Sequence, residues 1–292
     1  MICKLCPRKC GAVRDEDRGG GFCGMPSVPV CARAALHLWE EPCISGGTGA
    51  GTVFFSGCTL GCVFCQNRSI SRENFGKPLT EDQLYGVFQR LADQGASCIE
   101  LVTPTQFTHV LARVLKRPVP GGLPVVWNSG GYERVDVLKA LEGRVNVYLP
   151  DLKYVTPALA DKYSGAADYP EAAKGAIVEM VRQRGPVRLE DGLLKSGVLI
   201  RHLILPGQVN EAKGVMDWVS STFPPGAVLF SLMAQYTPVG EPAGFPELRR
   251  SLRPSELRAA RAYMENLGLA GYVQELSSSG EGFIPAFDLT GL

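Results

Sequence analysis

Seven of the ten cysteines in this 292-residue chain stand in two short clusters. The first cluster contains Cys3, Cys6, Cys10 and Cys23, and the second contains Cys58, Cys62 and Cys65. Cysteines two or three residues apart are poorly placed for a disulfide, but their thiolates can share a metal centre. No apolar segment typical of a signal peptide follows Met1, so we expect reduced thiols and a cytoplasmic protein. The fold must therefore present two sets of thiols for metal binding.

Composition and charge exclude several classes of protein. Apolar residues make up 45% of the chain, which excludes a disordered polypeptide. Thirty basic residues balance 29 acidic ones, so we expect no nucleic-acid partner. The longest apolar runs, such as 53–55 and 198–200, are far shorter than a membrane span, so we expect no membrane association.

From residue 51 onward, short β-branched and aromatic runs alternate with amphipathic stretches, a pattern typical of a parallel sheet covered by helices. Strands are predicted at 52–56, 98–102, 124–127, 145–149, 198–205 and 227–232. Helices are predicted from residue 80 and at 107–115, 133–141, 169–183, 211–222 and 254–266. Glycine or proline follows most strand ends. Since binding and catalysis lie at the carboxyl ends of parallel strands, we expect the active site there.

The second cysteine cluster lies in the loop directly after the first predicted strand, within the segment SGCTLGCVFCQN at 56–67. A closed zinc site needs four protein ligands, so zinc would require one more ligand from elsewhere in the chain. Three cysteines that hold a four-iron cluster leave one iron open for a substrate or cofactor. The spacing and position favour the cluster over zinc.

The spacing Cys-x3-Cys-x2-Cys after a first strand resembles the signature of the radical S-adenosylmethionine (SAM) enzymes. The flanking residues, GTVFFSGC before the loop and QN after it, are similar to the branch of the pyruvate formate-lyase activating enzyme, specifically to homologues with an N-terminal cysteine cap. Further similar segments are TPT at 103–105, WNSGGYE at 127–133, YLPDLKY at 148–154, RHL at 201–203 and QYTP at 235–238. The resemblance covers nearly the whole chain.

This resemblance implies a partial (β/α)6, TIM-like barrel over residues 51–292, with a C-terminal closing segment and a cysteine-rich cap over residues 1–50. It also implies an oxidoreductase that holds a 4Fe-4S cluster on Cys58, Cys62 and Cys65. The reduced cluster would cleave SAM to a 5′-deoxyadenosyl radical, which abstracts hydrogen from a substrate.

The resemblance further implies which strand ends bind SAM. The family's Gly-Gly-Glu segment is absent, and Thr103 and Thr105 take its place, although an ordinary strand-to-helix turn explains them equally well. Asn128 replaces an acidic residue beside Ser129, which puts a monovalent cation there in doubt. The remaining candidates are Asp151, Lys153, Arg201 and Gln235. Asp151 and Lys153 could instead form a structural ion pair, whereas a buried Arg201 needs a partner, for which a carboxylate of SAM or substrate would suit.

The four thiols of the cap could close around zinc or iron, hold a second iron–sulfur cluster, or stay reduced in a packed segment. The favoured hypothesis for function is hydrogen abstraction from a polypeptide, as in the activation of a glycyl-radical enzyme, with a flavodoxin or ferredoxin as electron donor by analogy. Two alternatives stay open: modification of a small metabolite or other protein, and a non-catalytic metal-binding or assembly protein.

Overall fold

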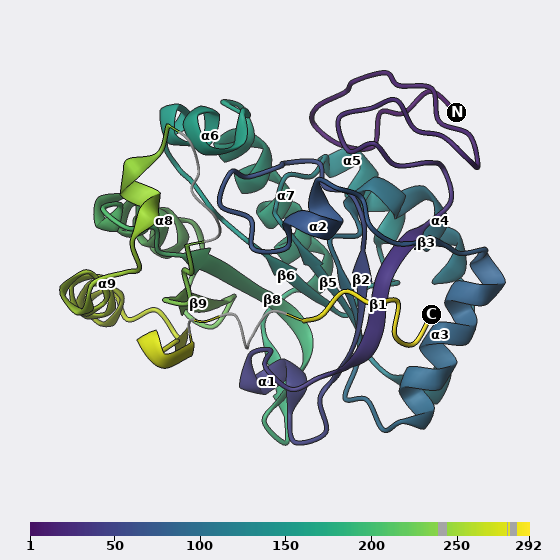
Figure 1. Ribbon diagram of the computed structural model, residues 1–292. Helices are drawn as coiled ribbons and strands as arrows, with labels where there is room; N and C mark the ends of the chain where they lie inside the picture. The colour runs from purple at the N-terminus through teal and green to yellow at the C-terminus, as the bar shows by residue number, and fades with distance from the viewer. Residues whose placement is uncertain (239–243, 279, 281–284) are drawn as a thin grey trace.

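The computed structural model describes residues 1–238, 244–278, 280 and 285–292. The described strands form one sheet in the order β10-β9-β8-β6-β5-β4-β2-β1-β3, with β7 paired to β8. From β2 to β10 along this order every pairing is parallel, whereas β1 and β3 form an antiparallel edge. The sheet ends at β10 and β3 without closing on itself, so the predicted partial barrel is confirmed (Figure 1).

The strands are β1 (Val30–His37), β2 (Ala50–Phe55), β3 (Lys77–Pro78), β4 (Ile99–Val102), β5 (Val125–Ser129), β6 (Val147–Pro150), β7 (Arg188–Glu190), β8 (Leu193–Leu203), β9 (Leu229–Met233) and β10 (Gly271–Val273). The helices are α1 (Pro42–Ser45), α2 (Arg68–Ser71), α3 (Glu81–Asp93), α4 (Thr108–Val114), α5 (Val135–Leu138), α6 (Pro157–Ser164), α7 (Tyr169–Arg184), α8 (Val209–Thr222) and α9 (Pro254–Asn266). Short 3-10 turns lie at 105–107, 120–122, 139–141, 246–249 and 276–278.

Local sequence explains where α3 begins and which face it buries. The Thr80 hydroxyl accepts a hydrogen bond from the Gln83 amide, and the Gln83 side chain accepts one from the Thr80 amide, at 3.2 and 2.8 Å. This reciprocal capping box satisfies two amides that the first turn leaves unpaired. Leu84, Val87, Phe88 and Leu91 are then buried along one face, as their spacing predicts.

Several elements were not predicted, namely β1, α1, α2, β3, α6, β7 and β10. Strand β1 pairs antiparallel with β2, and α6 and the β7–β8 hairpin lie later in the chain. Because β1 belongs to the sheet, the loop-rich part of the chain covers residues 1–29. The division into domains at residue 50 stays a prediction.

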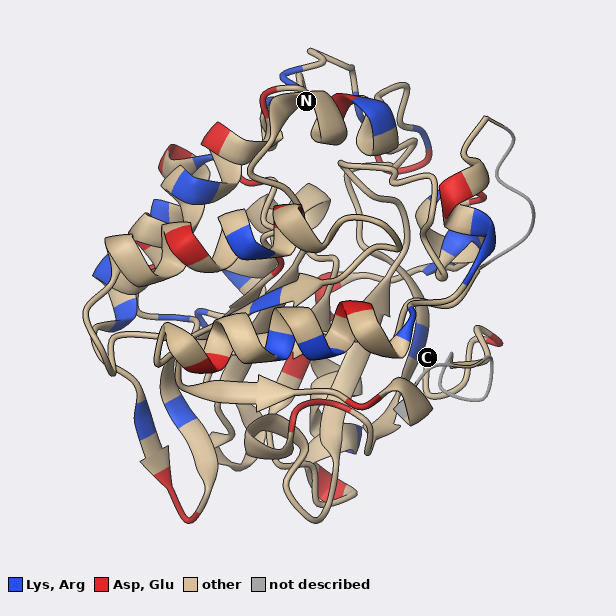
Figure 2. Ribbon diagram, turned by 90° about the vertical axis from the view of Figure 1, so that its left-hand side faces the viewer, with Lys and Arg blue, Asp and Glu red and all other residues tan. Residues whose placement is uncertain are grey.

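Residues 1–29 lie as a loop above the edge of the sheet (Figure 1). Arg14, only 1% exposed, donates hydrogen bonds to the carbonyl oxygens of Pro26 and Gln106. A buried arginine needs such acceptors, so this contact ties the loop to the start of α4. Basic and acidic residues are interspersed over the helices in Figure 2, in line with the net charge of +1.

Candidate active site

A cavity of about 550 Å³ lies at the carboxyl ends of the parallel strands. The eleven barrel residues predicted from the sequence all line it: Cys58, Cys62, Cys65, Thr103, Thr105, Asn128, Ser129, Asp151, Lys153, Arg201 and Gln235. They come from the ends of β2, β4, β5, β6, β8 and β9. Parallel strands bring these ends to one edge of the sheet, so residues far apart in sequence meet in one cavity.

Each sulfur of the cysteine loop has a hydrogen-bond donor. The amide of Leu60 lies 3.4 Å from Cys58 Sγ. The hydroxyls of Ser164 and Ser71 lie 3.1 Å from Cys62 Sγ and 3.3 Å from Cys65 Sγ. Donors aimed at sulfur stabilise thiolates and tune the potential of an iron–sulfur cluster.

The loop turns sharply at Gly57, whose φ is 76°. A Cβ at this position would lie 2.3 Å from Cγ of Met25 and 3.0 Å from the Cys23 carbonyl oxygen. Only glycine fits both the left-handed backbone and the close approach. The turn therefore seats the cysteine loop against the N-terminal segment.

The three thiols of this loop suit a four-iron cluster. Each thiolate of such a cluster binds a different iron, and three protein thiolates leave the fourth iron open. Cys58, Cys62 and Cys65 all line one cavity, and each has its own hydrogen-bond donor. Across the described ranges, no three His, Cys, Asp or Glu side chains are grouped as ligands of a single metal ion.

Burial raises the pKa of two of these thiols. It raises the pKa of Cys62 to about 11, although the nearby Lys153 ammonium opposes the shift. Burial also raises the pKa of Cys65. Since metal ligation requires thiolates, binding of a cluster here releases protons.

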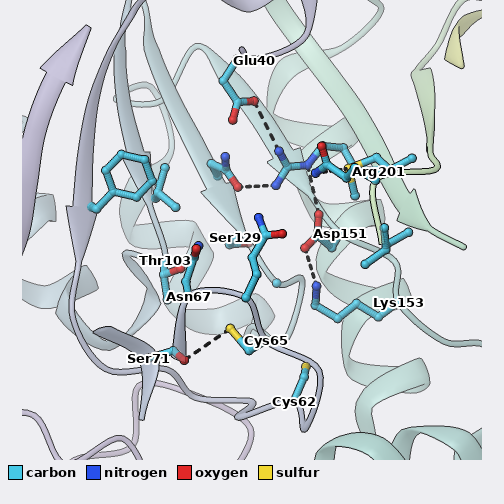
Figure 3. Close-up of a pocket in the computed structure, with 18 of the residues that line it drawn as sticks. Glu40, Cys62, Cys65, Asn67, Ser71, Thr103, Ser129, Asp151, Lys153 and Arg201 are labelled. Carbon is cyan, nitrogen blue, oxygen red and sulfur yellow. Dashed lines mark hydrogen bonds and ion pairs between the residues drawn. The ribbon is translucent and has the colours of Figure 1, made fainter. Parts of the chain in front are cut away.

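A network of charges forms the opposite wall of the cavity. Arg201 donates to Asp151 Oδ1 at 3.0 Å and to Asn128 Oδ1 at 2.6 Å, and it lies 3.4 Å from Glu40 Oε2. Lys153 Nζ lies 2.6 Å from Asp151 Oδ2. Figure 3 shows this chain running from Glu40 through Arg201 and Asp151 to Lys153, with Cys62 and Cys65 at the far end.

Two expectations for this wall are affected. We expected Arg201 to pair with a carboxylate of SAM or of the substrate. In the structure it already forms ion pairs with Asp151 and Glu40. Asp151 and Lys153 form the structural ion pair held open as an alternative, and both still line the cavity. Burial opposes ionisation of Asp151, but Lys153 and Arg201 hold its pKa below the usual range.

The segment after β4 carries polar groups at the cavity. Thr103 adopts a left-handed backbone with φ of 58°, rare for a threonine. Thr105 donates to the buried Glu133 at 3.1 Å, so that its hydroxyl is oriented by the protein. Gln106 donates to the carbonyl oxygens of Ser56, Gly57 and Thr103, which joins the cysteine loop to β4.

Sequence reasoning missed several residues of the site. Ser71 lies six residues after Cys65, close enough for the spacing to have suggested the contact, but Ser164 is 102 residues from Cys62. Asn67 follows the loop, and its buried Oδ1 has no hydrogen-bond partner among the described residues. Glu40, which contacts Arg201, was not among the predicted site residues.

The four N-terminal cysteines lie near one another. Burial raises the pKa of Cys6 to about 11, and Cys23, Cys3 and Cys10 each add to the shift. The absence of a single-ion grouping in the described ranges holds for these thiols too. A metal in the cap stays a prediction.

Arg8, between Cys6 and Cys10, joins the cap to the cysteine loop. Its guanidinium donates to the carbonyl oxygens of Thr59 and Leu60, each at 3.0 Å. It also donates to the carbonyl oxygens of Ser164, at 2.8 Å, and Gly165, at 2.5 Å. One side chain thus fixes the cap against the cysteine loop and the end of α6.

The open parallel barrel and the three-thiol cavity at its strand ends define a class of enzyme that holds an iron–sulfur cluster beside an organic cofactor. Residues 52–219 match the family model of the radical SAM superfamily. The chain belongs to this superfamily, whose enzymes use a 4Fe-4S cluster and SAM.

Similar proteins agree with the fold. The chain is 27% identical over 277 residues to the uncharacterized protein MJ0674 of Methanocaldococcus jannaschii, covering 91% of this chain and 75% of that protein. Streptococcus suis SuiB, solved with its precursor peptide SuiA, superposes with a TM-score of 0.53 at 11% identity over 75% of this chain. This chain spans 47% of SuiB. A spore photoproduct lyase mutant gives a TM-score of 0.52 at 12% identity, covering 79% of this chain and 78% of that one.

The helices give no sign of a membrane span. Within the described parts of the chain, none combines the length and the apolar character that crossing a bilayer requires.

Proposed function

We propose that this radical SAM enzyme abstracts a hydrogen atom from a polypeptide, as the activating enzymes of glycyl-radical proteins do. One observation carries the proposal: the cavity that holds the three thiols reaches an exposed apolar rim. Leu38 and Trp39 line the cavity and are 58% and 65% exposed. Exposed apolar side chains at the mouth of a site favour contact with a partner surface.

The similarity of the GTVFFSGC and QN segments to the activating-enzyme branch supports the same proposal. SuiB, which shares the fold, was solved bound to a precursor peptide, and a polypeptide substrate for this chain is consistent with that. The cap of residues 1–50 and the barrel of residues 51–292 are proposed as the two domains.

Cys58, Cys62 and Cys65 are proposed to hold the cluster. When bound, the cluster and SAM supply a 5′-deoxyadenosyl radical. Ser71 and Ser164 donate to two of the thiolates and hold them in place.

The polar strand-end residues are proposed to orient SAM. Thr103, Thr105, Asn128, Ser129 and Gln235 offer hydroxyl, amide and backbone groups toward the cavity. Asp151 and Lys153 offer one charge of each sign, already fixed by their ion pair. Fixed groups of this kind bind a zwitterionic ligand without reorganising.

The cap cysteines Cys3, Cys6, Cys10 and Cys23 are proposed to hold a second metal or cluster. A site closed by four protein thiolates leaves no open iron, so it would serve electron relay or structure. A flavodoxin or ferredoxin is the proposed electron donor. Metal analysis of wild type and of Cys6→Ser distinguishes zinc from iron.

Isotope transfer tests the proposed substrate class. A candidate protein labelled with deuterium at glycine is mixed with reconstituted enzyme, SAM and dithionite. Deuterium in 5′-deoxyadenosine is the expected result. Transfer from small metabolites in place of labelled proteins would overturn the polypeptide proposal and favour the small-molecule alternative.

A further inference from the structure

Two neighbouring glutamates lie at the end of the cavity away from the thiols. Glu40 and Glu41 stand in the turn between β1 and α1, and both line the cavity. Glu41 is 5% exposed, and the Glu40 side chain is 13% exposed. Figure 3 shows Glu40 across the cavity from Cys62 and Cys65.

Glu41 shares a side-chain hydrogen bond with Glu40. Its buried Oε1, however, is left without a hydrogen-bond partner among the described residues. A buried carboxylate oxygen without a partner costs stability, because nothing replaces the water it has lost. Such a group at a cavity wall indicates a ligand that supplies the missing donor.

The charges around the pair do not balance. Four carboxyl groups act on Arg201: Asp151, Glu40, Glu41 and Glu100. Arg201 and Lys153 are the basic groups that face them. The titratable side chains of His37 and Tyr272 also line the cavity; burial and Arg33 lower the pKa of His37, and burial raises the pKa of Tyr272. Carboxyl groups thus outnumber basic groups, and burial raises the pKa of Glu100, whose oxygens accept hydrogen bonds from Asn128 and Thr52. Burial and then Glu100 raise the pKa of Glu40 well above its usual range.

The residues around the pair suit an organic cation better than a metal ion. No cluster of three metal-ligating side chains exists in the described residues, so these carboxylates do not converge on one ion. Trp39, two positions before Glu41 in sequence, also lines the cavity. An aromatic ring beside carboxylates suits an ammonium or guanidinium group, which gains both hydrogen bonds and a cation–π contact.

We propose that Glu40 and Glu41 bind a positively charged group of the substrate, an ammonium or a guanidinium, across the cavity from the cluster. The inference rests on the proposed function, because it assigns the substrate's recognition element at the same site. On a polypeptide the group is a lysine or arginine side chain. On a small molecule it is an amine.

Titration calorimetry on the anaerobically reconstituted enzyme with SAM tests the proposal. The small probes are n-butylammonium chloride and 1-butanol, and the peptide probes are acetyl-Gly-Lys-Gly-amide and acetyl-Gly-Gln-Gly-amide. Ionic strength is matched with potassium chloride. We expect the lysine peptide to bind at least tenfold more tightly than the glutamine peptide. The enzyme either shows the same preference for n-butylammonium over 1-butanol or shows it for the peptides alone. Selectivity confined to the peptides identifies a polypeptide source, and selectivity in both pairs identifies the cation alone as the determinant.

Glu41→Gln should reduce this selectivity at least fivefold and raise the unfolding midpoint, because it removes an unpaired buried charge. Glu265→Gln, on the exposed face of α9, is the matched control and should keep the wild-type selectivity. Glu40→Gln serves as the second variant if Glu41→Gln does not fold. Equal binding of cations and neutral probes, or selectivity unchanged in the glutamate variants, overturns the inference.

Release of 5′-deoxyadenosine is measured on the same wild-type preparation. Release without cation selectivity rejects only the glutamate site. No release from enzyme with a full cluster rejects the proposed function itself.

Discussion

Replacement of Arg8 by alanine should loosen the cap from the barrel. The guanidinium donates to four backbone carbonyls, two in the cysteine loop and two at the end of α6. A hydrogen bond of this kind contributes roughly 0.5–1.5 kcal/mol, and the partly exposed ones lie at the low end. The guanidinium also stacks 3.8 Å from the Phe22 ring centroid, a contact that contributes on the order of 0.5–1 kcal/mol. We therefore expect Arg8→Ala to lower the free energy of unfolding by about 2–4 kcal/mol.

Equilibrium urea unfolding of the metal-free protein measures this loss, with limited proteolysis reporting whether residues 1–29 become the first site of cleavage. Arg188→Ala is the matched control, since its side chain is 66% exposed and its ion pair with Glu190 is 3.6 Å long. We expect that control to change the free energy by less than about 0.5 kcal/mol. A loss below about 1 kcal/mol in Arg8→Ala, with unchanged cleavage, would refute the view that Arg8 joins the cap to the cysteine loop.

Three further predictions follow from single contacts. Cys62→Ala should bind less iron than wild type and release no 5′-deoxyadenosine. Cys98→Ala, which changes a buried thiol far from the loop in sequence, should keep the iron content and the release of wild type. Equal iron content in the two variants would contradict the role of Cys62 as a cluster ligand. Asp151→Asn leaves Arg201 and Lys153 without their shared carboxylate and should lower the free energy of unfolding by about 3 kcal/mol. An unchanged urea midpoint would show that the ion pairs of Asp151 do not stabilise the fold. Burial, with Arg14, lowers the pKa of His109 to about 4. The unfolded chain then binds the proton more tightly, so this stabilisation is complete above about pH 6.5 and is lost as the pH falls toward 4. Stability measured over that range should fall less in His109→Gln than in wild type, and parallel curves would contradict this.

Local patterns predicted most of the parallel sheet and the cysteine loop. The capping box at Thr80 and the apolar face of α3 depend on residues within one or two turns, and the structure contains both. The cysteine loop follows β2 because strand, turn and ligands are contiguous in sequence. Strand β1 was missed because Arg33 and His37 interrupt its apolar pattern at the antiparallel edge.

Local sequence patterns could not predict contacts between distant parts of the chain. Arg201 meets Glu40 across 161 positions, and Arg8 meets Ser164 across 156. The sequence shows that a buried arginine needs a partner, but only the fold shows which carboxylate supplies it. The predicted cavity residues were found because parallel strands end at one edge, whereas their partners depend on how the loops pack.

Reductive cleavage of SAM tests the central claim most directly. The enzyme is reconstituted anaerobically with iron and sulfide, reduced with dithionite and mixed with SAM, and 5′-deoxyadenosine is quantified. Wild-type enzyme should release it in proportion to the cluster bound by Cys58, Cys62 and Cys65, and the Cys62→Ala variant should not. Wild-type enzyme that carries a full four-iron cluster and releases none would contradict the account.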